Sequence, residues 1–109
     1  MSLIKIIIYS TSTGSEPYCS WEDKLDTKTK AVVKNRLDRI KLGNFGDAKI
    51  IKGGDNIWEL RIDYGPGYRI YFGKQGISIV ILLVGGEKKS QSRDITKAIR
   101  YWSDYRSLL

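Results

Sequence analysis

The chain has 109 residues, of which 41% are hydrophobic, so it predicts one globular domain over residues 1–109. This size and composition exclude both a second core and a largely disordered chain. The net charge of +7 is spread over both halves of the sequence, which favours an anionic partner such as RNA, DNA or an acidic protein segment, although a merely soluble basic protein has the same balance.

Several kinds of site are excluded by the residue types present. The sequence has no histidine, so histidine-based acid–base catalysis and histidine metal sites are closed off. The single cysteine, Cys19, cannot form an internal disulfide and fits a reducing compartment. We find no signal peptide and no apolar run of membrane-spanning length, and therefore expect a cytoplasmic protein without a membrane partner.

The first half of the chain predicts a strand followed by a helical hairpin. Residues 3–9 are short and rich in isoleucine, which is typical of a strand. Pro17 suits the first turn of a helix whose apolar residues then recur at helical spacing. Thr27 or Thr29 is expected to cap a second helix, and Gly43 to end it in the left-handed conformation.

The second half predicts strands and one last helix. Residues 48–51 indicate a short strand, and residues 58–72, WELRIDYGPGYRIYF, a hairpin. Residues 77–84 are apolar without alternation, which indicates a strand covered on both faces. Ser90 or Ser92 is expected to cap the last helix. The order β-α-α-β-β-β-β-α predicts an α+β fold with one antiparallel sheet, an N-terminal helical hairpin and a C-terminal helix.

The hairpin predicts a pair of arginines on one face. With residues 65–67 as its loop, the apolar faces of the two strands coincide. On the opposite face Asp63 would then pair with Arg69 and Arg61 with Tyr71, so that the two arginines are diagonal neighbours able to grip one phosphate. The alternative is a solvated face on which Arg69 pairs with Asp63 and Arg61 lies near Glu59.

A second segment adds cations. Gly85 and Gly86 predict a sharp turn after the buried strand, which would bring Lys88 and Lys89 over the edge of the sheet at the start of the last helix. The sequence has no metal-binding carboxylate cluster, P-loop or dinucleotide fingerprint, and we expect no cofactor and no metal. Catalysis by positive charge remains, and RNA cleavage by its own 2′-hydroxyl needs only that charge and in-line geometry.

The segments RLDRIKLGNFGDAKII, ELRIDYGPGYRIYF and LLVGGEKKSQSRDITKA together resemble the RelE/ParE superfamily of bacterial toxins. The resemblance spans residues 21–102 and is strongest to the HigB-like, phage-related addiction module killer branch. It implies a RelE-like fold and the toxin of a type II toxin–antitoxin system. Many members are metal-independent, ribosome-dependent endoribonucleases that cleave mRNA.

The resemblance also assigns roles to residues. It implies that Arg61, Arg69 and Lys88 are catalytic. The remaining candidates for contact with RNA are Lys74, Tyr71, Lys89 and Arg93. Where some members use a tyrosine or histidine near the start of the last helix, this chain offers Asp94, so Asp94 and Tyr71 are the acid or base candidates, and Tyr71 is alternatively a surface on which a base stacks.

The partners that the resemblance implies are a cognate antitoxin and mRNA on the ribosome, with ribosomal RNA contacts and with operator DNA reached only through the antitoxin. Two other functions stay open: a non-catalytic, ParE-like inhibitor of DNA gyrase, and an inactive module that only binds antitoxin. We expect the antitoxin to cover the basic cleft or the helical hairpin. We also expect Arg69→Ala to abolish toxicity with little effect on stability, on the premise that Arg69 is exposed.

Overall fold

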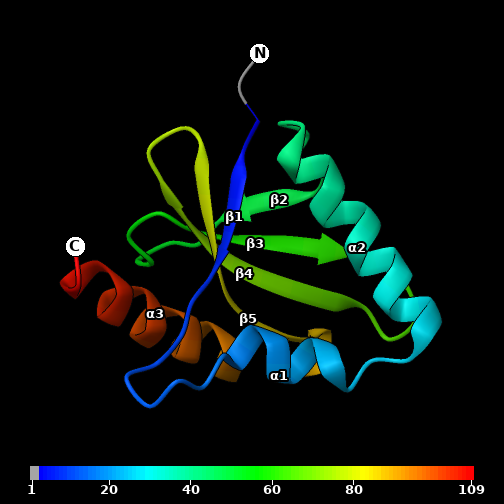
Figure 1. Cartoon of the computed structure of the whole chain (residues 1–109). Coiled ribbons are helices and arrows are strands. Elements are labelled where there is room, and N and C mark those ends of the chain that lie inside the picture. The colour runs from blue at the N-terminus through cyan, green and yellow to red at the C-terminus, as the bar shows by residue number, and fades with distance from the viewer. Residues whose placement is uncertain (1–2) are drawn as a thin grey trace.

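The computed structural model describes residues 3–109, which form a five-stranded sheet with helices on both faces (Figure 1). The sheet has the strand order β1-β5-β4-β3-β2. The elements in chain order are β1 (Lys5–Ile8), α1 (Pro17–Asp23), α2 (Thr27–Lys41), β2 (Ala48–Ile50), β3 (Ile57–Ile62), β4 (Tyr68–Gln75), β5 (Ile79–Glu87), the 3₁₀ turn η1 (Lys88–Ser90) and α3 (Gln91–Ser107). The α+β class and the element order are confirmed.

One strand pair differs from the expected sheet. Strands β2 to β5 are antiparallel neighbours, but β1 pairs with β5 in parallel, with Lys5 opposite Ile79 and Ile8 opposite Leu82. The chain reaches β5 from β1 only after the two helices and three other strands, so no hairpin constrains their relative direction. The sheet is therefore mixed.

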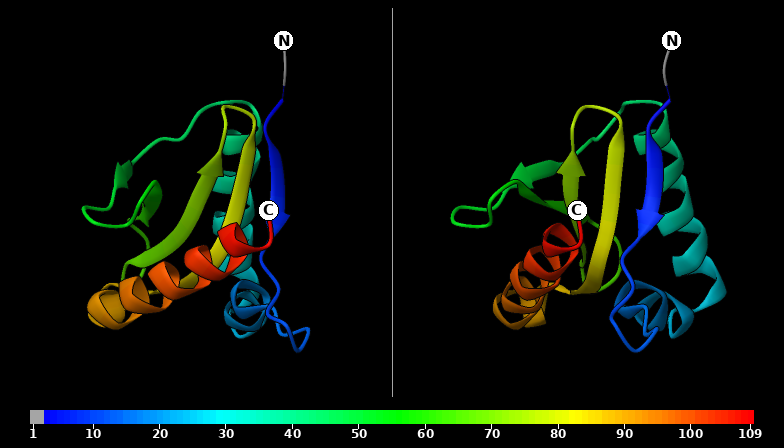
Figure 2. Two further views of the ribbon diagram at one scale, coloured as in Figure 1. Left: turned by 90° about the vertical axis from the view of Figure 1, so that its left-hand side faces the viewer. Right: turned by 60° about the vertical axis from the view of Figure 1, so that its left-hand side comes forward.

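The helices divide the core into two layers. Helices α1 and α2 cover one face of the sheet and α3 covers the other, as the turned views show (Figure 2). The layer between the sheet and helices α1 and α2 is built from Tyr18, Val33, Ile40, Leu60, Ile62, Ile70, Phe72, Val80 and Leu82. The layer between the sheet and α3 is built from Tyr9, Ile57, Tyr71, Ile81, Leu83, Val84, Ala98 and Trp102. Strand β5 contributes to both layers, which confirms that it is covered on both faces.

The helix ends follow local chemistry. Helix α2 is capped by Asp26, whose carboxylate accepts a hydrogen bond from the backbone N–H of Thr29 at 2.8 Å, so the predicted threonine caps are wrong by one position or more. Gly43 adopts φ +88° after α2 and its N–H bonds to the Ile40 carbonyl, as predicted. Within residues 3–109, no helix is long and apolar enough to cross a bilayer.

The two glycines of β5 do not turn the chain. The strand continues through Gly85 and Gly86 to Glu87, whereas the sequence predicts its end at residue 84. A Cβ added at Gly85 would lie 2.2 Å from the Trp21 ring, and one at Gly86 would lie 1.9 Å from the Asp94 carboxylate. The glycines are therefore needed so that α1 and α3 can approach the strand from opposite faces.

The β3–β4 hairpin has a longer loop than predicted. Ile62 pairs with Tyr68, and Arg61 lies directly opposite Arg69, so the predicted pairs Asp63–Arg69 and Arg61–Tyr71 are wrong by a shift of two residues. Residues 63–67 form the connection, in which the N–H of Gly67 bonds to the Tyr64 carbonyl at 3.0 Å. A shift of two residues leaves every side chain on its predicted face, because strand side chains alternate with period two.

Candidate functional site

A cleft lies where the β3–β4 loop meets the 3₁₀ turn η1. It encloses about 370 Å³ and contains the three residues that the sequence analysis singles out as catalytic, Arg61, Arg69 and Lys88. Each cation comes from a different element, namely β3, β4 and η1. The full lining is Asp47, Arg61, Asp63, Gly65, Pro66, Gly67, Arg69 and Lys88. The structure thus brings the three cations to one place.

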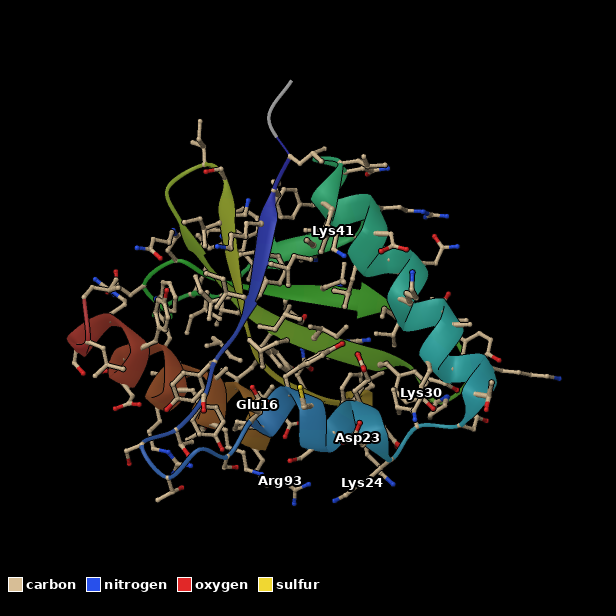
Figure 3. All side chains as sticks on the ribbon, viewed as in Figure 1. Glu16, Asp23, Lys24, Lys30, Lys41 and Arg93 are labelled. Atoms are coloured by element: carbon tan, nitrogen blue, oxygen red, sulfur yellow. The ribbon has the colours of Figure 1, made fainter. Side chains whose placement is uncertain are left out.

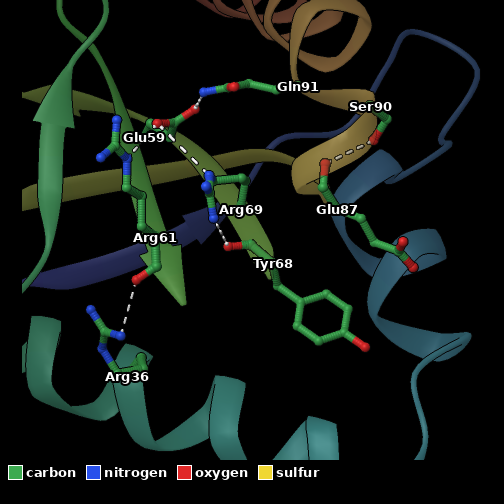
Figure 4. Close-up of polar contacts among 8 residues, drawn as sticks. All are labelled: Arg36, Glu59, Arg61, Tyr68, Arg69, Glu87, Ser90 and Gln91. Atoms are coloured by element: carbon green, nitrogen blue, oxygen red, sulfur yellow. Dashed lines mark hydrogen bonds and ion pairs between the residues drawn. The ribbon is translucent and has the colours of Figure 1, made fainter. Parts of the chain in front are cut away.

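Arg61 and Arg69 are held by a buried carboxylate beneath them (Figure 4). Glu59 is 1% exposed and lies on the same face of the hairpin. Its Oε1 accepts a hydrogen bond from Arg61 Nε at 3.1 Å and lies 4.0 Å from Arg69 Nε. Its Oε2 accepts a hydrogen bond from Gln91 Nε2 of α3 at 2.6 Å. Because buried charges need partners, these contacts hold the Arg61 guanidinium in place and put a counter-charge near that of Arg69.

Glu59 was not among the predicted site residues. The alternation of β3 already places it beside Arg61 on the α3 face. A carboxylate on the buried face of a strand needs compensation by neighbouring donors, and the two arginines provide it. The sequence therefore contains the signal, but only in combination with the knowledge that α3 covers this face.

Arg69 is less exposed than predicted. Only 9% of the residue is accessible, since it lies in a central strand beneath the loop. Its Nη1 donates a hydrogen bond to the carbonyl of Tyr68 at 3.1 Å. Its Nε is buried and, among residues 3–109, has no partner within hydrogen-bonding geometry. The premise that Arg69 is exposed is therefore wrong. We now expect Arg69→Ala to destabilise the fold, because this change would leave part of the Glu59 charge without a neighbour.

Lys88 reaches the cleft from the other side of the loop. Its backbone N–H donates to the Gly67 carbonyl at 2.8 Å, and its side chain is exposed. Gly67 has φ +81°, and a Cβ there would lie 3.5 Å from Lys88 Cβ and 3.8 Å from Arg69 Nη1. The end of the loop therefore lies close to both cations, and its positive φ favours glycine.

Tyr71 is completely buried in this structure. It is 0% exposed, lies under α3 with Ala98 and Trp102, and so cannot stack on a base as a surface aromatic. Burial, and then the nearby Glu59 charge, raise the pKa of its hydroxyl, which keeps the hydroxyl protonated. Tyr71 therefore lies behind the cationic cleft and does not line it.

Lys74, a candidate for contact with RNA, lies away from the cleft. Its ammonium lies 4.0 Å from the Phe45 ring centre and 3.9 Å from that of Trp58, on the face covered by α1 and α2. Burial lowers the pKa of this lysine. The contact with two aromatic faces is typical of a cation–π interaction.

Three further candidates line a different groove. Lys89, Arg93 and Asp94 lie on the other side of η1, between α1 and α3. Asp94 is buried and accepts a hydrogen bond from the Ser90 hydroxyl at 2.5 Å, so Ser90 bonds to a side chain where a backbone cap was predicted. Asp94 is thus separated from the cleft that contains Arg61, Arg69 and Lys88.

Potential metal ligands are scattered. In the part of the chain from residue 3 to residue 109, no three Cys, Asp or Glu side chains cluster closely enough to hold an ion. The carboxylates at the cleft are Asp47 and Asp63 on its lining and Glu59 beneath it. The cleft therefore combines three cations with two carboxylates on its lining and a third carboxylate beneath.

Comparisons with known proteins give a consistent result. A family model described as "Phage derived protein Gp49-like (DUF891)" matches residues 20–101. A Haemophilus influenzae protein described as uncharacterized is 48% identical over 80 residues, which are 72% of this chain and 79% of that protein. The structure of an arginine-to-alanine double mutant of the E. coli toxin RelE in the free state matches with a TM-score of 0.67 and 14% identity, covering 92% of this chain and 97% of RelE. At that identity the likeness to RelE is one of fold.

Proposed function

Because the chain belongs to the phage-derived Gp49-like family, and with it to the RelE/ParE-type toxin superfamily, we propose that it is the toxin of a type II toxin–antitoxin system and cleaves mRNA on the ribosome. The observation that carries this proposal is the cleft in which Arg61, Arg69 and Lys88 meet. Arginine offers paired donors for phosphate oxygens, and lysine adds a mobile positive charge. Within the superfamily, we assign the protein to the HigB-like branch.

The cleft suits transesterification of RNA. The 2′-oxygen attacks the adjacent phosphorus, a 2′-O–P bond forms, the bond from phosphorus to the 5′-oxygen breaks, and the products are a 2′,3′-cyclic phosphate and a 5′-hydroxyl. The cations stabilise the negative charge that grows on the phosphoryl oxygens. Among the groups lining the cleft, Asp47 or Asp63 accepts the proton of the 2′-hydroxyl, and the Lys88 ammonium donates one to the 5′-oxygen.

Glu59 acts indirectly in this proposal. Its contacts with Arg61 and Gln91 hold the arginine side chain before RNA arrives, so less reorganisation is needed during the reaction. It is a positioning residue, because it lies beneath the cations and is 1% exposed. The alternative function as a gyrase inhibitor has no use for cations fixed in this way around a phosphate.

The partners follow from the same chemistry. We propose that mRNA and ribosomal RNA are reached in the cytoplasm, and that the cognate antitoxin inhibits the toxin by presenting acidic groups to its basic surface. Contact with operator DNA would then pass through the antitoxin. The charge of +7 supports an anionic partner in each case.

Two neighbouring lysines provide the test. Lys88 lines the cleft, whereas Lys89 is exposed on the other side of η1 and lies 3.6 Å from Glu87. Lys88→Ala is expected to lower mRNA cleavage about 100-fold, in the range seen when one donor to a developing oxyanion is removed. Lys89→Ala removes the same charge one residue away but outside the cleft, so it should lower cleavage far less than Lys88→Ala does. Primer extension on mRNA from induced cells measures both.

Two results would contradict the proposal. Equal cleavage by the Lys88→Ala and parent proteins would mean that the cleft is not the active site. Intact transcripts together with accumulating gyrase–DNA breaks would select gyrase inhibition. Both variants change exposed side chains, so thermal melting should show folded protein in each case.

A further inference from the structure

A second groove lies between α1 and α3, on the far side of η1 from the cleft. It encloses about 550 Å³ and is the larger of the two. Its lining comes from α1 and the residues beside it, the end of β5, η1 and α3. The catalytic scheme proposed above makes no use of it.

The groove is basic, and its cations come from three separate parts of the chain. Lys24 follows α1, Lys89 belongs to η1, and Arg93 and Lys97 lie one turn apart on α3. In Figure 3, Lys24 and Arg93 project on the same side of the molecule, below α1. Lys24, Lys89 and Arg93 are exposed, so their charges can reach a ligand in solvent, although Lys89 also lies 3.6 Å from Glu87.

The acidic residues of the lining are already engaged. Glu87 lies 3.6 Å from Lys89, and Asp94 is buried and bonded to the Ser90 hydroxyl. Their contacts offset part of the positive charge without removing it, because four cations line the groove against two carboxylates. The groove therefore attracts a polyanion.

Aromatic side chains and the position of η1 narrow the choice of polyanion. Trp21 and Tyr101 are half-buried in the lining. The Trp21 ring packs against Gly85 and the Tyr101 ring stacks on Tyr9 with centroids 5.2 Å apart, so each ring offers its remaining exposed part to a ligand. Bases of single-stranded nucleic acid stack on such rings while the backbone follows the positive charges. Lys88 lines the cleft and the next residue, Lys89, lines the groove, so the two sites adjoin across η1.

We propose that this groove binds the single-stranded RNA that continues from the phosphate held in the cleft, and so extends the substrate-binding surface beyond the reacting nucleotides. The inference rests on the proposed function for the cleft. Lys24, Lys89, Arg93 and Lys97 contact backbone phosphates, and Trp21 or Tyr101 stacks on a base. An acidic peptide would use the cations but would gain nothing from the rings.

The test measures RNA binding directly. The probe is a fluorescein-labelled oligouridylate of about twelve nucleotides, within the range that single-strand binding sites cover, with 2′-O-methyl groups that prevent cleavage. Arg93→Gln/Lys97→Gln is expected to weaken binding about tenfold and to lower the slope of log affinity against log salt by about 1.4, for two lost phosphate contacts. The matched control is Lys30→Gln/Lys34→Gln, which removes the same charge from the cleft between β1 and α2. It should leave both quantities near those of the parent.

The outcomes separate this inference from the proposed function. Equal losses of RNA affinity in the groove variant and the control variant would contradict RNA binding in the groove. An oligoglutamate of similar length that binds as tightly as the RNA would contradict it too. If the parent cleaves mRNA and the groove variant binds RNA like the parent, only the groove fails. If the parent does not cleave mRNA but the groove variant loses RNA binding, the groove stands and the proposed function fails.

Discussion

The two faces of the β3–β4 hairpin differ in chemistry although the same two strands build both. On the face under α1 and α2, Leu60 and Ile70 lie opposite each other in an apolar layer. On the face toward α3, Arg61 lies opposite Arg69, with Glu59 buried beside them. Like charges directly opposite in a sheet are destabilising unless a counter-charge compensates them.

This difference separates a face that stabilises the fold from a face that, in the proposed function, meets RNA. An apolar pair in a core stabilises the protein through burial alone. A buried ion cluster contributes less than apolar residues of the same volume, and replacing such a cluster is often neutral or stabilising. The ion cluster therefore makes this face less stabilising than an apolar face would be, and it supports the cationic cleft above it.

The largest expected effect comes from breaking the ion cluster. Glu59→Ala leaves Arg61 and Arg69 close together without their counter-charge, so we expect the free energy of unfolding to fall by about 3 kcal/mol. Leu60→Ala, its neighbour on the opposite face, should cost a similar ~3 kcal/mol through the cavity it leaves. Urea unfolding followed by circular dichroism measures both. The two changes should differ in activity, since only Glu59→Ala displaces the cleft arginines.

The control for this prediction removes the whole cluster. Glu59→Leu combined with Arg61→Leu and Arg69→Met replaces the ions with apolar side chains. This triple variant should unfold with a free energy at least equal to that of the parent and should no longer cleave mRNA. A triple variant less stable than Glu59→Ala would show that the charges serve the fold, contrary to the comparison above.

A smaller effect is expected on the apolar face, where Lys74 is a cation without a carboxylate. Burial lowers the pKa of Lys74 in the folded state, so the unfolded chain binds more protons between that pKa and the ordinary value near 10.4. Stability should therefore rise with pH through this window in the parent relative to Lys74→Met, in which the other titrating groups are the same. Urea unfolding at neutral pH and near pH 10 measures the difference, and mRNA cleavage should be unchanged. A parent free energy of unfolding that falls with pH relative to that of Lys74→Met would contradict this expectation.

Local patterns in the sequence predicted the elements and the faces. The alternation of β3 placed Arg61 and Glu59 on one face, the isoleucine-rich start indicated a strand, and Gly43 ended α2 as predicted. These features depend on neighbours along the chain, which a single sequence displays. The meeting of Arg61, Arg69 and Lys88 was also predicted, from the faces of the hairpin and the position of Lys88 after the last strand, and the family resemblance added their catalytic role.

The misses involve contacts between distant segments. The hairpin register was wrong because a shift of two residues preserves the alternation. Tyr71 was expected at the surface, but α3 covers it, and Gly86 lies in the strand because Asp94 of α3 packs against it. Nothing near these residues in the sequence shows which face α3 will occupy.

The most direct test of the central claim is to locate the RNA backbone on the protein. Titration of ¹⁵N-labelled protein with a short, 2′-O-methylated oligouridylate should shift the backbone amide resonances of Gly67, Arg69 and Lys88 most strongly, since these residues surround the cleft. The amides of Ile8 and Lys34, at the cleft between β1 and α2, should stay in place. Shifts confined to that region, with Gly67 and Lys88 unchanged, would contradict the claim that three cations gather around an RNA phosphate.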